Sequence, residues 1–355
     1  MLYLAMISNS FRKSSIAELS RAGRFSIVEE RASTLIIESE EADMVGKLER
    51  QTPIFIYLLL PLPHVSSISK EDYLGSIITA GLSAARKGLK IRAECYDVNS
   101  KEGYSAKDIE VRLGRRMESE GYEISLEQPD ALLYLVLING TCYSGCMDKQ
   151  MLKRDFINPE RHYHRYSRNA ISRAELKLIQ AFDEFSISAS GIAIDLGAAP
   201  GGWSKFLAEK GLCVIAVDKG SLDYRKLEEN SIKAREETLP YVHNPNEPAG
   251  IIHLRARAED ASGQCKLSAD LMVNDMNLSP ANSAALALSM AGLLKPGSQM
   301  VMTVKCIDRK AERHLQTVEK ALAPIFRIER KAVLPSNRQE ITILATYAGQ
   351  MHPTL

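Results

Sequence analysis

The sequence predicts an α/β protein whose second half folds as a mostly parallel sheet with helices on both faces. From residue 191 onward, short apolar runs alternate with segments of helical period, as they do when strands and helices follow one another. Only LPSNRQ (334–339) separates the last two strands, so these should form an antiparallel C-terminal hairpin at one edge of a seven-stranded sheet. Strands are expected near 192–196, 214–218, 251–254, 271–275, 299–305, 325–330 and 340–347, and helices near 203–210, 280–294 and 309–322.

The first half has a different organisation. Residues 1–65 alternate short apolar runs with charged stretches and end at a proline-punctuated segment, which favours a small α+β unit. Residues 66–150 predict a helix, a strand, a second helix and a β-hairpin with an Asn-Gly turn. The expected ranges are 72–88, 90–99, 105–121 and 130–146, with Ser105 as the N-cap and Gly121 beyond the end of the second helix.

Length and composition set the outer limits. A chain of 355 residues is expected to hold two or three domains, and 45% hydrophobic residues are enough for real cores. We predict boundaries at 1–65, 66–150, 151–189 and 190–350, where 151–189 is a basic linker followed by a helix over 172–185. No apolar run reaches 18 residues and the N-terminus does not read as a secretory signal, so no membrane span is expected. The scattered cysteines favour reduced thiols in a cytoplasmic protein, without a metal site: Cys95, Cys142, Cys146, Cys213, Cys265 and Cys306.

The linker concentrates positive charge that the net charge of +1 conceals. Between Lys153 and Lys177, nine positions are Lys, Arg or His and three are acidic, with aromatic residues interleaved. This pattern suits phosphate contacts and base stacking, although a solvated linker helix has the same composition. Under the first interpretation the RNA-binding residues are Lys153, Arg154, Arg161, Arg165, Arg168 and Arg173.

The stretch AIDLGAAPGGWSKFLAEKGLCVIAVD (193–218) predicts a cofactor site. It reads as a strand, a glycine-rich turn, a helix and a second strand that ends on Asp218. In a doubly wound sheet a ligand binds at the carboxyl ends of the strands, where glycines allow close approach and an acid can accept hydrogen bonds from a ribose. The expected cofactor-binding residues are Asp195, Gly197, Ala198, Pro200, Gly201, Gly202, Trp203, Asp218, Asp260 and Asp275.

The spacing of the glycines discriminates between cofactors. A dinucleotide site has G-x-G-x-x-G, which rests a pyrophosphate on a helix N-terminus, whereas this chain has G-A-A-P-G-G. Trp203 opens the helix where it would crowd a diphosphate, although packing explains it equally well. A cofactor with ribose and adenine but no phosphate fits better, and we therefore predict S-adenosylmethionine.

The motif D-L-G-A-A-P-G-G-W resembles that of the FtsJ-type (RrmJ-like) ribose 2′-O-methyltransferases, and S-R-A-E-L-K-L at 172–178 resembles the segment that precedes it in that family. The resemblance covers about 171–347 and implies a Rossmann-like class I methyltransferase fold. It also implies a Lys-Asp-Lys-Glu catalytic tetrad, whose members here are Lys177, Asp275, Lys305 and Glu340. In that assignment Lys305 is the base; the direction of its pKa shift is open, because Lys177 would lower it and the two acids would raise it.

The first half also carries a resemblance, to the large-subunit rRNA ribose methyltransferases in which a THUMP RNA-binding domain precedes an FtsJ-like domain. It rests on GTCYSG (140–145), on AECYDVNSKEG (93–103) and on the basic linker. The implied partner is RNA, 23S rRNA or an assembling large subunit. The alternatives are an FtsJ-like enzyme acting on tRNA, small-subunit rRNA or an mRNA cap, and a non-catalytic ribosome-assembly factor; a dinucleotide oxidoreductase comes last.

Two assignments stay open. Asp260 is chosen as the adenine-contacting acid, but Glu259 beside it or neither residue would serve. Residues 219–250 form a longer connection than expected, which is a lid, an RNA-contact element or an added surface helix and loop. The oligomeric state is not predicted.

Overall fold

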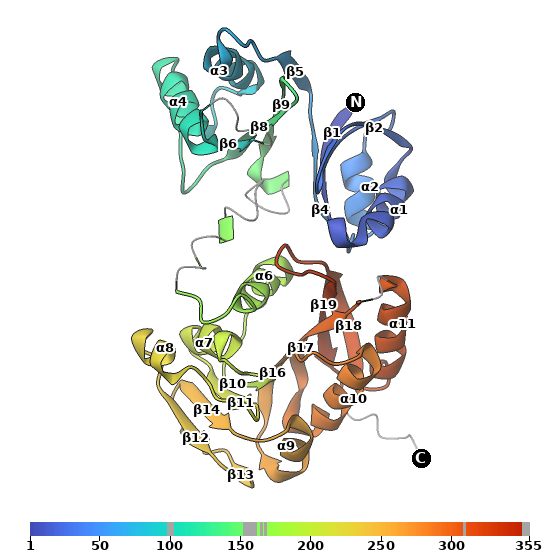
Figure 1. The fold of residues 1–355 in the computed structure, drawn as a ribbon, viewed down its shortest axis with the longest axis vertical. Coiled ribbons are helices and arrows are strands. Elements are labelled where there is room, and N and C mark those ends of the chain that lie inside the picture. Colours follow the sequence, from blue (N-terminus) through green and yellow to red (C-terminus); the bar gives the residue numbers. More distant parts are fainter. Residues whose placement is uncertain (98–102, 152–161, 164–165, 167–168, 308–309, 350–355) are drawn as a thin grey trace. The chain divides into compact units, whose positions relative to one another are not determined.

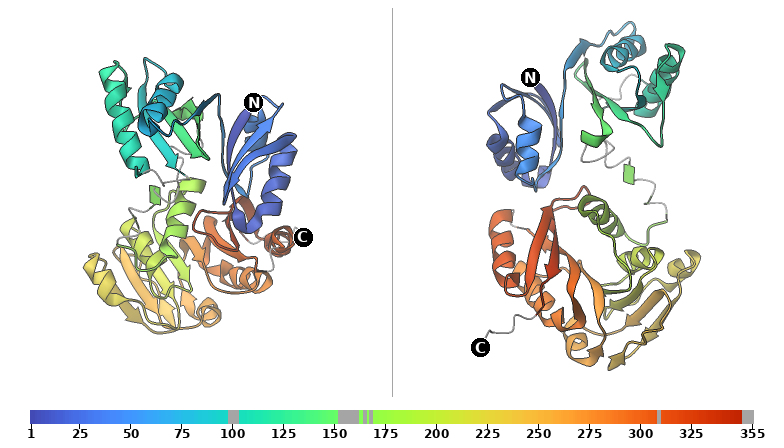
Figure 2. Two further views of the ribbon diagram at one scale, coloured as in Figure 1. Left: turned by 45° about the horizontal axis from the view of Figure 1, so that its top comes forward. Right: turned by 180° about the vertical axis from the view of Figure 1, so that it is seen from behind.

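The computed structural model describes residues 1–97, 103–151, 162–163, 166, 169–307 and 310–349. The chain forms two compact units, Met1–His162 and Tyr163–Leu355 (Figures 1 and 2). Among the helices of these residues, none is both long enough and apolar enough to cross a membrane.

The first unit begins with an antiparallel sheet in the strand order β2-β3-β1-β4. Alternate residues of β1 face opposite sides of this sheet: Tyr3 and Ala5 pack with the helices, whereas Leu4 and Met6 face the next sheet. One face is therefore covered by helices and the other by the next sheet. Its elements are β1 (Leu2–Ile7), η1 (Asn9–Phe11), α1 (Arg12–Ala22), β2 (Phe25–Arg31), β3 (Thr34–Ser39), α2 (Met44–Arg50) and β4 (Ile56–Pro61).

A second sheet in the same unit has the order β5-β9-β8-β6-β7. Its elements are β5 (His64–Ser67), α3 (Tyr73–Ala84), β6 (Lys90–Asp97), α4 (Ala106–Ser119), β7 (Glu123–Ile124), β8 (Ala131–Ile138), β9 (Thr141–Asp148) and η2 (Lys149–Met151). Ser105 caps α4 in a reciprocal capping box with Asp108, and Asn139 and Gly140 take positive φ in the hairpin turn. The predicted helix–strand–helix–hairpin order is confirmed. Because β8 is buried on both faces, the two sheets share a hydrophobic core.

The second unit contains an eight-stranded sheet in the order β12-β14-β11-β10-β16-β17-β19-β18, in which β19 runs opposite to the other strands (Figure 1). Its elements are α6 (Glu175–Phe185), β10 (Ile192–Leu196), α7 (Gly202–Glu209), β11 (Cys213–Val217), α8 (Tyr224–Glu229), β12 (Ala234–Glu237), β13 (Tyr241–Val242), β14 (Gly250–Leu254), α9 (Ala258–Gln264), β15 (Cys265–Lys266), β16 (Ala269–Asn274), α10 (Pro280–Met290), η3 (Ala291–Leu293), β17 (Leu294–Lys305), α11 (Ala311–Leu322), β18 (Phe326–Ala332) and β19 (Glu340–Tyr347). Strand order reverses between β10 and β16, which places the expected ligand site there.

The sheet has one strand more than the seven predicted. All seven expected strands are present, and β12 extends the edge beside β14. This strand, together with α8 and β13, comes from residues 219–250, so the long connection is an added helix and edge strand. Its sequence AREE lacks an apolar alternation, because an edge strand that is half exposed needs none.

The helix that follows the basic linker packs within the second unit. Phe182 of α6 meets Phe206 of α7 edge to face, with ring centroids 5.0 Å apart. α6 therefore lies directly beside the helix that the glycine motif opens.

Candidate active site

Four charged side chains from distant parts of the second unit form a closed ring. Lys177 Nζ lies 3.0 Å from Asp275 Oδ2 and 2.6 Å from Glu340 Oε1. Lys305 Nζ lies 2.6 Å from Asp275 Oδ1 and 2.5 Å from Glu340 Oε2. Each lysine thus bridges both carboxylates, and the structure brings all four predicted tetrad residues together.

The topology explains this convergence. Asp275 directly follows β16 and Lys305 is the last residue of β17, so both lie at the carboxyl edge of two adjacent parallel strands. Glu340 begins β19, which runs antiparallel and pairs Glu340 with Lys305 in register. Lys177 enters from the first turn of α6.

Burial makes the charges of the ring interdependent. The four side chains are between 8% and 15% exposed, so solvent screens them weakly. Burial alone would raise the pKa of Asp275, but Lys305 and Lys177 outweigh it and hold the pKa below its usual range. Burial alone would lower the pKa of Lys305, but Asp275 and Glu340 outweigh it and raise the pKa. The pKa of Lys305 is therefore shifted upward, a direction that the sequence alone left open.

A fifth residue, missed in the sequence, supports the ring. The Thr303 hydroxyl donates to Asp275 Oδ1 at 2.7 Å, and Thr303 is almost fully buried. Thr303 lies two residues before Lys305 on β17, and residues two apart on a strand point to the same side. That spacing is the signal that could have identified it.

The glycine motif forms the turn between β10 and α7. Gly197 and Gly201 have φ values of 78° and 111°, which L side chains rarely adopt. A Cβ on Gly197 would lie 2.6 Å from Met276 Cγ, so the turn approaches the segment after Asp275 closely. The glycine turn therefore lies at the switch point between β10 and β16, close to the segment that carries Asp275.

A cavity of about 440 Å³ opens beside this turn, within the usual range of small-molecule sites. Gly197, Asp218 and Asp275 line it, so three of the predicted cofactor residues share one cavity. The Asp218 carboxylate accepts hydrogen bonds from Ala199 N at 3.0 Å and Gly220 N at 2.7 Å, which fixes its orientation.

The other predicted cofactor residues do not line this cavity: Asp195, Ala198, Pro200, Gly201, Gly202, Trp203 and Asp260. Asp195 is fully buried and accepts the Ser204 hydroxyl at 2.6 Å, so it ties β10 to α7; burial raises its pKa to about 7. Trp203 is buried and donates from Nε1 to the Ala174 carbonyl at 2.7 Å, which is packing against the start of α6.

Glu259, and not Asp260, is among the residues that line the cavity. Both residues lie in the first turn of α9, where successive side chains point about 100° apart around the axis. The geometry thus favours Glu259, the neighbour that the sequence left as an alternative.

A buried ion pair connects the tetrad to the glycine motif. Glu175, two residues before Lys177, lies 2.8 Å from Lys205 of α7, and both side chains are at most 4% exposed. Burial alone would lower the pKa of Lys205, but the carboxylates of Glu175 and Glu209 outweigh it and raise the pKa, so Lys205 stays charged. The start of α6 is therefore anchored to the helix that begins at the cofactor turn.

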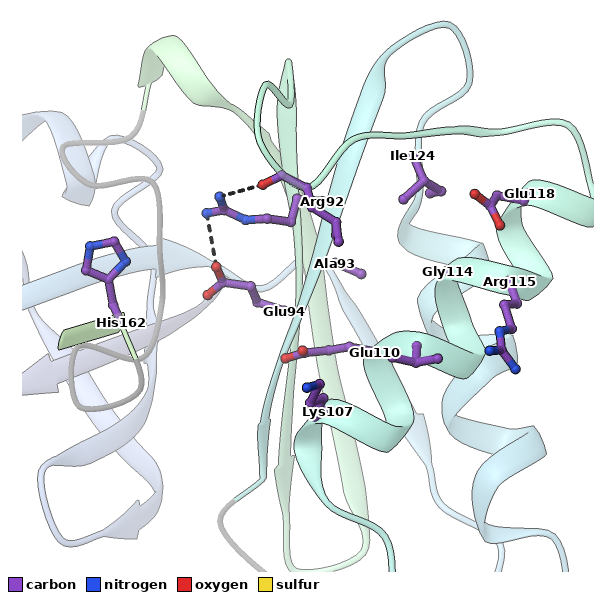
Figure 3. Close-up of a pocket in the computed structure, with 12 residues that line it drawn as sticks. Arg92, Ala93, Glu94, Lys107, Glu110, Gly114, Arg115, Glu118, Ile124 and His162 are labelled. Atoms are coloured by element: carbon purple, nitrogen blue, oxygen red, sulfur yellow. Dashed lines mark hydrogen bonds and ion pairs between the residues drawn. The ribbon is translucent and has the colours of Figure 1, made fainter. Parts of the chain in front are cut away.

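A larger cavity, of about 570 Å³, lies in the first unit between β6 and α4 (Figure 3). Arg92 pairs there with Glu94 at 3.0 Å, and Glu110 accepts a hydrogen bond from the backbone of Cys95. Its lining contains as many carboxylates as arginines and lysines, so it lacks the net positive charge that attracts a phosphate backbone. None of the predicted site residues lines it.

Of the six basic residues predicted to bind RNA, only Arg173 is among the residues that the structure describes. Arg173 is exposed just before α6. The others, Lys153, Arg154, Arg161, Arg165 and Arg168, lie outside the described residues.

Comparison with known proteins shows which part of the chain resembles a known family. Residues 170–321 match the model of the FtsJ-like methyltransferase family. An uncharacterized protein of Methanocaldococcus jannaschii is 28% identical over 49% of this chain and 44% of its own length. The ribosomal RNA large subunit methyltransferase M of Shewanella putrefaciens is 28% identical over 63% of this chain and 67% of its own, and that of Shewanella frigidimarina is 30% identical over 48% and 49%. The chain thus matches from about half to two thirds of these relatives' lengths.

Among solved structures, TrmN from Thermus thermophilus aligns with 98% of this chain and 100% of its own at 15% identity. Its TM-score of 0.40 supports no conclusion about function.

Proposed function

Because residues 170–321 form an FtsJ-like methyltransferase domain, whose cofactor is S-adenosylmethionine, we propose that this chain methylates ribose 2′-hydroxyls of RNA, in large-subunit rRNA in particular. The observation that carries the proposal is the ring of Lys177, Asp275, Lys305 and Glu340, one member of which lines the cavity beside the glycine turn.

The assignment of the RNA rests on the relatives. Two of those described above are named as large subunit rRNA methyltransferases, and one alignment covers more of this chain than residues 170–321 alone. We therefore assign an RNA-binding, THUMP-like role to the region 66–150 and to the basic linker that follows. We also propose a cytoplasmic location, because thiols stay reduced there and the six cysteines, all of which lie in the described residues, form no disulfide bond.

The cavity suits the cofactor. We assign the Asp218 carboxylate, which two backbone N–H groups orient, to the ribose hydroxyls, and Glu259 to the adenine. Gly197 has no side chain, and a Cβ at this position would clash with Met276. When bound, S-adenosylmethionine supplies an electrophilic methyl group on a sulfonium.

In the proposed mechanism Lys305, once deprotonated, takes the proton of the ribose 2′-hydroxyl as that oxygen attacks. The ammonium formed on Lys305 is stabilised by Asp275 and Glu340, which makes Lys305 a stronger base than a lysine in water. Lys177 pairs with the second oxygen of each carboxylate and holds both in place, and the Thr303 hydroxyl fixes Asp275 by a hydrogen bond.

This assignment predicts an alkaline pH–rate profile. Since the pKa of Lys305 is raised above its ordinary value, only a small fraction is deprotonated at pH 7, and that fraction grows by about tenfold per pH unit. The single-turnover rate should rise accordingly between about pH 7 and 9. In Glu340→Gln, loss of one carboxylate lowers the pKa of Lys305, so the rise should shift to lower pH. A flat profile in the unsubstituted protein would exclude Lys305 as the base.

The target is tested by mapping ribose methylation in RNA from cells with and without the gene by mass spectrometry. The proposal expects one 2′-O-methyl group of the large-subunit rRNA to disappear in the deletion strain. Loss of a methyl group from tRNA or small-subunit rRNA instead would reassign the substrate but keep the enzyme class. If every methyl group persists, the assignment to RNA methylation is wrong.

A further inference from the structure

A fully buried histidine links the candidate cofactor site to the added segment 219–250. His253 of β14 is 0% exposed, and its Nε2 lies 3.1 Å from the backbone carbonyl oxygen of Asp218. Its Nδ1 lies 2.9 Å from the hydroxyl of Tyr224, in the first turn of α8. The proposed chemistry uses neither side chain.

The direction of these hydrogen bonds follows from their partners. A carbonyl oxygen can only accept, so His253 Nε2 carries a proton and donates it to Asp218. In the neutral ring Nδ1 is then an acceptor, and Tyr224 donates to it. Burial raises the pKa of Tyr224, with the charge of Glu236 acting in the same direction, so the hydroxyl stays protonated. The relay therefore runs from Tyr224 through His253 to the backbone of Asp218.

Asp218 is the residue that this relay can influence. Its carboxylate lines the cavity and is held by Ala199 N and Gly220 N, while His253 holds its carbonyl. The residue at the end of β11 is thus fixed through both its side chain and its backbone. The Asp218 N–H also donates to the Leu254 carbonyl at 3.3 Å, so losing the His253 hydrogen bond would loosen the Asp218 backbone rather than free it.

The same segment also supports the glycine turn. Asp223, the N-cap of α8, donates its backbone N–H to the Pro200 carbonyl at 2.8 Å. Leu222 and Leu227 are buried beside Gly201, at 3.7 Å and 3.9 Å from the position of a Cβ on that glycine. In Figure 1, α8 and β12 lie at the end of the sheet that carries β14 and β11. The added segment thus packs on the cofactor turn.

We propose that Tyr224 and His253 are positioning residues that orient Asp218 for binding the ribose of the cofactor. In this proposal residues 219–230 support the cofactor site by packing against it. This inference rests on the proposed function, since it presumes a ribose-bearing cofactor. It makes Tyr224 a determinant of ribose recognition although it does not line the cavity. The proposal assigns residues 219–230 a supporting role in place of the lid or RNA-contact role considered from the sequence.

The test measures binding of S-adenosylhomocysteine and of its 2′-deoxyribose analogue to the full chain by calorimetry. The unsubstituted protein should prefer the ribose form, and Tyr224→Phe should weaken that form by about threefold to tenfold, the loss that one hydrogen bond brings. The deoxy analogue should lose less, so the preference between the two ligands shrinks. His253→Gln, whose amide can still donate to the Asp218 carbonyl, should retain more of the preference than His253→Ala.

A matched control lies in the same segment. The hydroxyl of Tyr241 lies 3.2 Å from His243 Nδ1, and the hydrogen bonds described for Asp218 involve neither residue, so Tyr241→Phe should leave both affinities unchanged. If Tyr224→Phe weakens both ligands by the same factor, or leaves both unchanged, the positioning role is wrong. If the unsubstituted protein binds neither ligand, the proposed function itself fails, which is a separate result.

Discussion

Lys305→Ala is expected to abolish methyl transfer, with a loss of about a thousandfold or more in the single-turnover rate. The variant removes the proposed base and leaves Asp275 and Glu340 with Lys177 alone. Affinity for S-adenosylhomocysteine should stay within a few-fold, because Lys305 is not among the residues that line the cofactor cavity. Rate and affinity are measured on the same preparation, by quench and by calorimetry.

Two further variants make this result specific. Lys305→Arg keeps a cation between the two carboxylates but cannot be deprotonated at neutral pH, so it should be as inactive as Lys305→Ala. Lys295→Ala, at the other end of β17, removes an exposed lysine that pairs with Asp270, and should keep full activity. Activity in Lys305→Arg would show that the residue acts by charge alone. Equal losses of rate and affinity in Lys305→Ala would indicate a binding or folding role.

The four residues of the ring were predicted from the family resemblance, and the elements whose ends they occupy explain why they meet. Asp275 and Lys305 end apolar runs of strand length, and the carboxyl ends of adjacent parallel strands share one edge. Glu340 reaches the same edge because only a short turn separates it from the preceding strand, which makes β19 antiparallel. The resemblance to the FtsJ-type family identified all four residues, and strand periodicity and loop length explain why Asp275, Lys305 and Glu340 share one edge.

The features that sequence reasoning missed depend on the rotation of a side chain about its helix axis, on the weak pattern of an edge strand, or on contacts between residues distant along the chain. Glu259 and Asp260 are adjacent acids, and only the phase of α9 decides which one faces the cavity. The edge strand β12 lacks the apolar alternation that identifies buried strands. His253 and Tyr224 meet across a 29-residue separation, and no local pattern marks either as a partner of Asp218.

The largest effect on stability is expected from Glu175→Ala. The substitution leaves Lys205, whose side chain is 4% exposed, with only the partly exposed Glu209 as a partner at 3.1 Å. It also removes the acceptor of the Ile171 N–H at 3.0 Å. Breaking a buried pair in this way costs about 3–5 kcal/mol, or about 10 °C in the unfolding midpoint of a domain of this size.

The measurement is thermal unfolding of the full chain with and without S-adenosylhomocysteine, because the transition that the ligand shifts belongs to the second unit. Glu229→Ala is the matched control: it removes an exposed partner of Arg225 at 3.6 Å on α8, where the expected change is below about 0.5 kcal/mol. A midpoint for Glu175→Ala within about 2 °C of the unsubstituted protein would mean that the pair contributes little. Because Glu175 precedes Lys177 by two residues, methyl transfer should also fall at temperatures where the variant is still folded. That result would show that the Glu175–Lys205 pair holds Lys177 in position relative to the glycine turn.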